Sequence, residues 1–270
     1  MIYKTFPRQI LSMSDQKHIN TFIQCGCVVC CLILCICGFL QFVYPKVSVV
    51  SSSGDRKIPI YCVATDKPQV SISFDAAWGN EDTEILLDIL AKNNVKATFF
   101  MTGGWVDNYP DDVKKIAEAG HDLGNHSQNH KQMSQLGTEE IKSEIMTPHE
   151  KVKALTGISM TLFRPPYGDY NNQLVETANT LGYNVIQWDV DSLDWKDYGA
   201  DSIVETVLNH KHLGNGSIIL MHNGAKYTKD ALERVIVGLK DKGFEIVPIS
   251  QLIYPNNYYT DHEGRQHPNQ

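Results

Sequence analysis

The chain has 270 residues and a mass of 30.4 kDa, with 42% hydrophobic and 20% charged residues. This composition excludes wholesale disorder and predicts a packed core. The formal net charge is −7, and no block of five or more Lys or Arg residues occurs. Nucleic-acid binding usually requires such a basic patch, so DNA and RNA are not expected partners.

Residues 19–45 contain no Asp, Glu, Lys or Arg, and most of their side chains are apolar. As a helix, residues 21–44 would extend roughly 36 Å, which is enough to cross a hydrocarbon core of about 30 Å. We interpret this run as one transmembrane anchor and residues 1–20 as a cytoplasmic N-terminus, because Lys4, Arg8 and Lys17 precede the run. A cleaved signal peptide is the alternative, but no convincing small-residue cleavage site follows.

Six of the seven cysteines lie within this apolar run. There the thiols act as small apolar side chains, so we interpret the CxxC of Cys27 and Cys30 as packing rather than redox or metal chemistry. Cys62 lies outside the run, and the sequence therefore predicts no disulfide framework.

The rest of the chain divides into a stem at 45–66, a domain at 67–253 and a polar C-terminal tail at 254–270 without periodicity. Within the domain, short β-branched runs predict buried strands at 70–74, 95–100, 160–163, 185–188, 217–221 and 244–247. Amphipathic segments predict helices at 83–92, 110–119, 139–155, 173–181, 201–208 and 229–240, with Pro148 kinking or dividing the third. This alternation predicts an α/β fold with a parallel sheet, either open or closed into a barrel.

Polar side chains follow the predicted strands at the points where the strands end. They are Asp75, His126 and His130 after the weak strand HDLG, Arg164, the acids Asp189, Asp191 and Asp194, and His222. The carboxyl ends of parallel strands share one edge of the sheet, where active sites form in such folds. The sequence therefore predicts an active site built from five separate segments.

His126 and His130 are four residues apart, so on a helical turn their imidazoles would project to the same side and share one metal ion. A borderline metal such as zinc suits two imidazoles and one carboxylate oxygen, with open positions left for water.

The motifs FDAAWGNEDT, GNHSQNH, RPPYG, DVDSLDW and LMHNG occur in this order. They resemble the five motifs of the polysaccharide deacetylases, carbohydrate esterase family 4, which have a NodB homology domain. The resemblance covers residues 67–253. It implies a distorted (β/α) barrel with fewer than eight strands, here preceded by one transmembrane helix, and metal-dependent removal of acetyl groups from N-acetylated glycans.

The resemblance also implies roles for individual residues. Asp75 corresponds to the general base that activates the attacking water, and His222 corresponds to the general acid that protonates the departing amine. The remaining positions correspond to metal ligands (His126, His130), the arginine that holds the base (Arg164), a backbone amide that binds the oxyanion (Tyr167), the acid that orients the catalytic histidine (Asp191) and the lining of the acetyl pocket (Trp195, Leu220).

The match breaks at Ala76, where the family has an aspartate that binds the metal. Water could complete the coordination, Asp75 could bind the metal itself, or Glu81 or Asp82 could substitute. We expect a divalent metal, zinc in our interpretation, to bind more weakly than in a complete site. The alternative is a catalytically silent domain that binds glycan without releasing acetate.

An anchored member of this family would act on N-acetylated polymers outside the cytoplasm. We therefore expect a single-pass protein of the cell membrane with an extracytoplasmic catalytic domain. The anchor, the short stem and the FDAAWG variant resemble those of cell-wall deacetylases of spore-forming bacteria, which implies peptidoglycan as the substrate and a role in sporulation. A glycosidase using paired carboxylates among Asp189, Asp191 and Asp194 is a weaker alternative, as is a peptidase, since no HExxH motif occurs.

Overall fold

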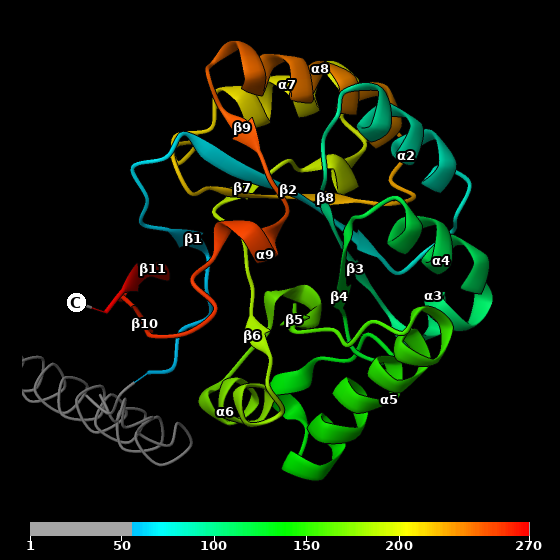
Figure 1. Ribbon diagram of the computed structural model, residues 1–270, viewed down its shortest axis with the longest axis vertical. Coiled ribbons are helices and arrows are strands. Elements are labelled where there is room, and N and C mark those ends of the chain that lie inside the picture. The colour runs from blue at the N-terminus through cyan, green and yellow to red at the C-terminus, as the bar shows by residue number, and fades with distance from the viewer. Residues whose placement is uncertain (1–55, 270) are drawn as a thin grey trace, which may run out of the picture. The chain divides into compact units, whose positions relative to one another are not determined.

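A curved parallel sheet forms the centre of the computed structural model, which describes residues 56–269 (Figure 1). The strand order is β6-β5-β4-β3-β2-β8-β7, and every pairing along this path is parallel. The strands are β2 (Gln69–Ala76), β3 (Thr98–Met101), β4 (Asp122–Asn125), β5 (Leu162–Phe163), β6 (Asn184–Val185), β7 (Val190–Asp191) and β8 (Ile218–His222). A short strand, β9 (Glu245–Ile246), also pairs with β2.

Helices lie around the outside of this sheet (Figure 1). Pro110 at the first helical turn and Gly157 in a left-handed C-cap mark two of their ends. We expected Pro148 to kink or divide its helix; α5 is not divided there, and Pro148 is buried inside it. The helices are α2 (Thr83–Lys92), α3 (Gly103–Asn108), α4 (Pro110–Glu118), α5 (Thr138–Thr156), α6 (Asn172–Thr180), α7 (Ala200–Leu208), α8 (Thr228–Asp241) and α9 (Ile249–Leu252).

The alternation along β2 separates the two faces of the sheet. Val70, Ile72, Phe74 and Ala76 belong to the larger apolar cluster, which packs the sheet against the helices. Ser71, Ser73 and Asp75 face the other, inner side, because successive strand residues point to opposite faces. A smaller apolar cluster, which includes Phe100, Leu162 and Ile218, accompanies them. The inner side of β2 therefore carries polar groups toward the carboxyl end of the sheet.

The sheet is a partly open barrel rather than a closed one, because β6 and β7 do not pair with each other. The chain around Ile60 bridges this gap: Ile60 pairs in parallel with Ile186, and Cys62 pairs antiparallel with Ser217. The predicted parallel α/β fold with fewer than eight strands along the barrel wall is thus confirmed for the described residues, as a curved half-barrel.

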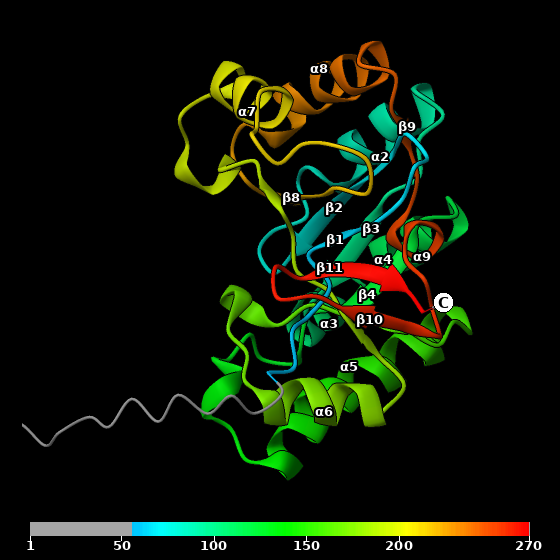
Figure 2. The ribbon, with the colours of Figure 1, turned by 90° about the vertical axis from the view of Figure 1, so that its left-hand side faces the viewer.

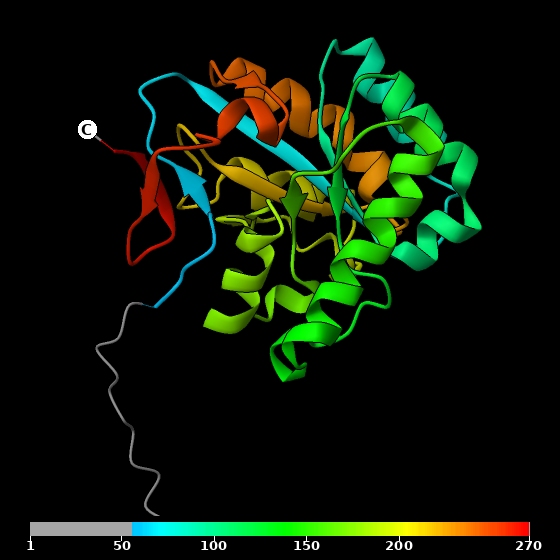
Figure 3. The same cartoon turned by 60° about the horizontal axis from the view of Figure 1, so that its bottom comes forward.

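The C-terminal segment forms strands, although we expected a tail without regular structure. β10 (Tyr258–Thr260) and β11 (Arg265–Pro268) form an antiparallel hairpin, and β11 pairs in parallel with β1 (Cys62–Val63). Figure 2 shows this small sheet beside the main one, and Figure 3 shows its hairpin apart from the central strands. The pairing between residues about 200 positions apart has no local sequence signal, which explains why periodicity missed it.

The predicted cytoplasmic segment 1–20, the anchor 21–44 and most of the stem lie outside the described residues. Within residues 56–269, none of the helices combines the length and the apolar character that a membrane span requires.

Candidate active site

A pocket of about 420 Å³ lies at the carboxyl ends of the central strands. The structure brings most of the residues predicted from the sequence to this pocket: Asp75, His126, His130, Tyr167, Asp191, Trp195, Leu220 and His222 line it. Ala77, Trp78 and Trp188 complete the lining. The parallel strands explain the convergence, since β2, β4, β7 and β8 all end at this edge.

Asp75 and Arg164 form a buried ion pair at the floor of the site. Arg164 Nη1 donates to Asp75 Oδ1 at 2.7 Å, while Nη2 donates to Ser73 Oγ at 2.9 Å and to the Gln187 carbonyl at 3.2 Å. The Phe100 ring lies 4.1 Å from the guanidinium carbon. Burial opposes ionisation of Asp75, but Arg164 and, to a lesser extent, His126 hold the pKa of this carboxyl below its usual range. Asp75 is therefore ionised at neutral pH, as a general base must be.

Replacing Arg164 with methionine is expected to lower the free energy of unfolding by about 3–5 kcal/mol, because the change leaves the Asp75 carboxylate buried without its partner. Urea unfolding of both proteins measures the difference. Arg234→Met is the matched control: Arg234 pairs with the exposed Asp201, and a surface pair contributes about 0–1 kcal/mol. Equal losses in the two variants would contradict the structural role assigned to Arg164.

His126 and His130 lie together, but on a loop rather than on the helical turn that their spacing suggested. Ser127 and His130 have positive φ angles of 66° and 52°. The Asn125 side chain accepts from Ser127 N–H, and Ser127 Oγ accepts from His130 N–H. Asn129 anchors the loop to α5 through two hydrogen bonds to Glu144. The two imidazole centroids are 4.9 Å apart, so the proximity that the HxxxH spacing predicted is confirmed even though its helical basis was wrong.

The tautomer of His126 follows from its hydrogen bond. Nδ1 lies 2.7 Å from the Arg164 carbonyl oxygen, which can only accept, so Nδ1 carries the proton. The lone pair of Nε2 is then free on the side facing Asp75, whose Oδ2 is 3.5 Å away. Burial lowers the pKa of His126 to about 4, so the imidazole is neutral at pH 7. A neutral imidazole held in this way is suited to bind a metal through Nε2.

His222 is oriented by Asp194 and not, as we expected, by Asp191. His222 Nδ1 lies 2.7 Å from Asp194 Oδ1, and Asp194 Oδ2 accepts from the His222 backbone N–H at 2.7 Å and from Thr228 Oγ1 at 2.6 Å. Asp191 instead accepts from the backbone N–H of Leu193. A tight turn through Leu193, which has a positive φ of 56°, brings the second acid of the DSLDW motif to the histidine.

The electrostatics of His222 favour its protonated form. Burial alone lowers the pKa of the imidazole, but the hydrogen bond and the negative charge of Asp194, together with Asp75 and Asp191, raise the pKa above the ordinary value. The site therefore places a carboxyl with a lowered pKa and an imidazole with a raised pKa in one pocket.

Asp189 does not line this pocket. Its carboxylate accepts from Ser217 Oγ at 2.9 Å and from the Ile218 backbone N–H at 2.8 Å. Burial raises the pKa of Asp189 to about 6. The three acids that could have formed a glycosidase pair thus have separate partners, since Asp194 binds His222 and Asp191 caps a turn.

Ala76 is fully buried in the apolar cluster on the helix side of β2, and the pocket is lined by its neighbours Asp75 and Ala77. Neither proposed substitute reaches the pocket, because Glu81 lies against Gly79 and Asp82 pairs with Lys229 at 2.6 Å. Within residues 56–269, no group of three His, Cys, Asp or Glu side chains is arranged to hold a metal ion. The imidazoles of His126 and His130 and the Asp75 carboxylate are the potential metal donors that come closest to forming such a group.

Exposed aromatic rings surround the mouth of the pocket. Trp78, Tyr167 and Trp195 are 55%, 66% and 52% exposed, which is unusual for such large side chains. Tyr167 adopts a positive φ of 61°, and its ring packs 4.5 Å from that of His130. Trp78, which sequence reasoning did not single out, lies 5.9 Å from His222 and 6.2 Å from His130 between ring centroids. Its position in the first motif, two residues after Ala76, is the sequence signal that could have identified it as a site residue.

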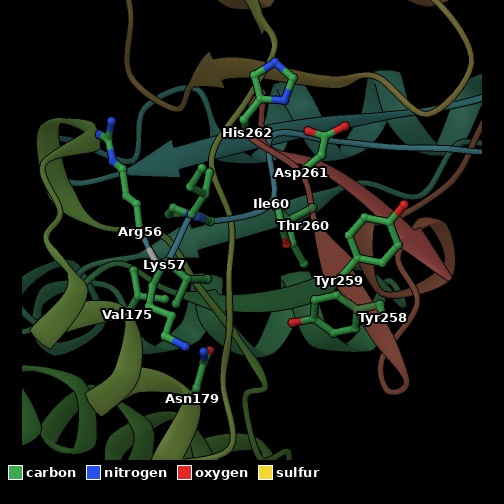
Figure 4. Close-up of a pocket in the computed structure, with 13 residues that line it drawn as sticks. Arg56, Lys57, Ile60, Val175, Asn179, Tyr258, Tyr259, Thr260, Asp261 and His262 are labelled. Atoms are coloured by element: carbon green, nitrogen blue, oxygen red, sulfur yellow. The ribbon is translucent and has the colours of Figure 1, made fainter. Parts of the chain in front are cut away.

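Another cavity, of about 570 Å³, lies away from these groups, between the start of the described chain and the β10–β11 hairpin. Figure 4 shows Arg56 and Lys57 on one side of it and Tyr258 and Tyr259 on the other. None of the residues implied by the five motifs lines this cavity, so the chemistry belongs to the smaller pocket.

Comparison with known proteins agrees with this geometry. The family model described as polysaccharide deacetylase matches residues 63–186. A peptidoglycan-N-acetylglucosamine deacetylase from Bacillus cereus is 34% identical over 191 residues, which make up 69% of this chain and 69% of that protein. The chain belongs to the polysaccharide deacetylase family.

Two further proteins are similar to this polysaccharide deacetylase family member. The protein YlxY of Bacillus subtilis is 39% identical over 196 residues, and the matched region covers 72% of this chain but only 60% of YlxY. The crystal structure of a CE4 family pseudoenzyme from Bacillus anthracis has a TM-score of 0.70 and 34% identity, and covers 73% of this chain and 69% of that one. A mutant of the same pseudoenzyme is described as having restored enzymatic activity.

Proposed function

We propose that this protein removes N-acetyl groups from a cell-wall glycan, with peptidoglycan as its substrate and a divalent metal, zinc, as its cofactor. The observation that carries the proposal is the pairing of two opposite catalytic groups in one pocket. Arg164 favours the ionised form of Asp75, and Asp194 favours the protonated form of His222. Hydrolysis of an acetamide needs a base for water and an acid for the departing amine.

The residues divide this chemistry between them. Asp75 accepts a proton from the attacking water as the carbonyl carbon is attacked. His222 Nε2 then donates a proton to the amine nitrogen as the carbon–nitrogen bond breaks, while Asp194 holds Nδ1 and stabilises the imidazolium before this transfer. Leu220 and Trp195 line the pocket beside these groups and exclude water around the acetyl methyl group. Each positioned acid or base contributes on the order of 10²- to 10⁴-fold in rate.

The metal, when bound, would lower the pKa of water and polarise the acetamide carbonyl. His126 Nε2 and His130 are the groups that would hold it, and neutral imidazoles suit zinc. Because Ala76 supplies no carboxylate, water must complete the coordination. We expect weaker binding than in a site with a second aspartate for this reason.

Calorimetric titration of the full chain with zinc tests the metal site without reference to activity. We expect one zinc ion to bind and His126→Ala to weaken that binding by at least about tenfold, because the variant removes a ligand whose lone pair faces Asp75. His121→Ala serves as the control, since His121 is buried elsewhere and accepts from the Ala97 backbone N–H. Zinc binding that is the same in all three proteins would place the metal elsewhere.

We further propose that residues 21–44 anchor the protein in the cell membrane, with its catalytic domain outside the cytoplasm and a role in sporulation. The uncharged apolar run supports the anchor. Peptidoglycan lies outside the membrane, which supports the orientation. Comparing cortex muropeptides from a deletion strain with those from its parent tests the role in sporulation, and identical profiles would contradict it.

A second candidate function is glycan binding without catalysis. Ala76 and the likeness to a CE4 family pseudoenzyme favour it. Mass spectrometry of peptidoglycan fragments incubated with the full chain separates the candidates. Loss of acetyl groups at unchanged chain length is the result we expect. Bound but unmodified fragments would support the binding function, and shortened chains would support a glycosidase.

A further inference from the structure

A pocket of about 670 Å³, distinct from the 570 Å³ cavity beside the β10–β11 hairpin, adjoins the candidate active site and is called the second pocket below. The two pockets share Trp188 and Asp191 as lining residues. The second pocket lies over the gap between β6 and β7, where the chain around Cys62, the loop at His210–His212 and the end of the β10–β11 hairpin meet. A substrate that extends beyond the acetamide can therefore reach toward this neighbouring pocket.

The charged groups of this second pocket include Lys211 and Arg265, and the charge of Arg265 already acts on the neighbouring Asp189. Within the part of the chain that the structure describes, neither the Lys211 ammonium nor the Arg265 guanidinium has a carboxylate within 4.0 Å. The Arg265 guanidinium donates a long hydrogen bond to the Val63 carbonyl at 3.4 Å, and its backbone N–H donates to Asp261 Oδ1 at 2.9 Å. Glu263 and the buried Asp189 provide carboxylates on the same pocket. The pocket thus offers separated positive and negative groups together with the Tyr61 and Trp188 rings.

We propose that this pocket binds the peptide attached to the muramic acid residues of peptidoglycan, an inference that rests on the proposed function. In muramic acid the acetamide is on one ring carbon, and the lactyl ether that carries the peptide is on the next. An acetamide in the active site therefore directs the peptide toward a space that shares a wall with that site. Lys211 and Arg265 bind peptide carboxylates, and Asp191 and Glu263 accept from peptide amides or an ammonium group.

The mixture of charges distinguishes this ligand from an unsubstituted sugar. A neutral sugar ring needs hydroxyl partners and an aromatic face, but it offers no carboxylate to Lys211 or Arg265. A stem peptide carries amides, carboxylates and, in many cell walls, an ammonium group. Charge-assisted hydrogen bonds to such groups are stronger than neutral ones, so the peptide should add affinity.

Calorimetric binding to the full chain, with chelator present to prevent turnover, tests the inference. The ligands are a disaccharide tetrapeptide from peptidoglycan, the same disaccharide without peptide, and di-N-acetylchitobiose. We expect the peptide-bearing ligand to bind about tenfold more tightly than either of the others. In the double variant Lys211→Ala, Arg265→Ala this advantage should fall to within about threefold. Lys242→Ala, an exposed lysine at the end of α8, is the control.

Equal affinities for the three ligands, or an advantage that survives in the double variant, would overturn the peptide site. Acetate release, measured separately with metal present, distinguishes this failure from failure of the proposed function. Acetate release without a preference for the peptide-bearing ligand would support the deacetylase function and contradict the peptide site. A peptide preference that depends on Lys211 and Arg265, without any acetate release, keeps the site on a glycan-binding protein.

Discussion

The substitution Asp75→Asn is expected to lower kcat/KM for acetate release by on the order of 10²- to 10⁴-fold, because it removes a positioned general base. The amide keeps the shape of the side chain and an oxygen that can accept from Arg164 Nη1. It also leaves the buried guanidinium without a counter-charge, so this variant should unfold more easily than wild type. The amide cannot take a proton from water at neutral pH. Rates of acetate release from peptidoglycan fragments, measured against wild type at several substrate concentrations, give the ratio.

Asp82→Asn is the matched control for this variant. Asp82 is a buried carboxylate, it is paired with a cation, and it lies outside the pocket. Its variant should therefore lose less than about threefold in kcat/KM. Thermal unfolding of both variants shows whether either change acts through the fold. A comparable loss of activity in the two variants, or an Asp75→Asn protein within threefold of wild type, would remove Asp75 from the catalytic step.

Asp194→Asn should shift the pH dependence of the reaction as well as its rate. The active form has Asp75 ionised and His222 protonated, so activity falls as the pH rises through the pKa of His222. Burial lowers that pKa, and the hydrogen bond to Asp194, together with the charge of Asp194, is the main influence raising it. In the variant the folded-state pKa drops, and the alkaline limb of the profile must move to lower pH. We expect a loss of about 10²-fold or more at neutral pH.

Asp191→Asn provides the comparison that separates the two acids of the DSLDW motif. Asp191 contributes only its charge to the pKa of His222 and makes no hydrogen bond with it, so its variant should shift the alkaline limb less. A larger shift from Asp191 than from Asp194 would reverse our assignment. Profiles of kcat/KM between pH 5 and 9 give both limbs for the three proteins.

The sequence predicts those helices and strands that have a clear apolar periodicity of their own. The strands around Phe74 and Leu220 and the helices α2 and α8 lie close to their predicted ranges, because apolar periodicity is strong in each. The C-terminal hairpin had no such pattern. It is polar, and its parallel pairing with β1 depends on contacts between the two ends of the described chain.

The site shows a similar division. Strand ends in a parallel sheet lie at one edge, so the sequence alone predicts the grouping of Asp75, His126 and His222. The sequence does not predict which acid binds His222, because Asp191 and Asp194 are three residues apart on the same turn. The left-handed conformation of Leu193 decides between them, and nothing in the residue type foretells it.

Acetate release by the full chain tests the central claim most directly. Peptidoglycan fragments are incubated with the protein, with added zinc in one series and with chelator in the other, and free acetate is measured over time. We predict release that depends on zinc, is lost with chelator and is nearly abolished in the Asp75→Asn variant. A folded protein that binds the fragments but releases no acetate in either series would contradict a catalytic role and leave a glycan-binding domain.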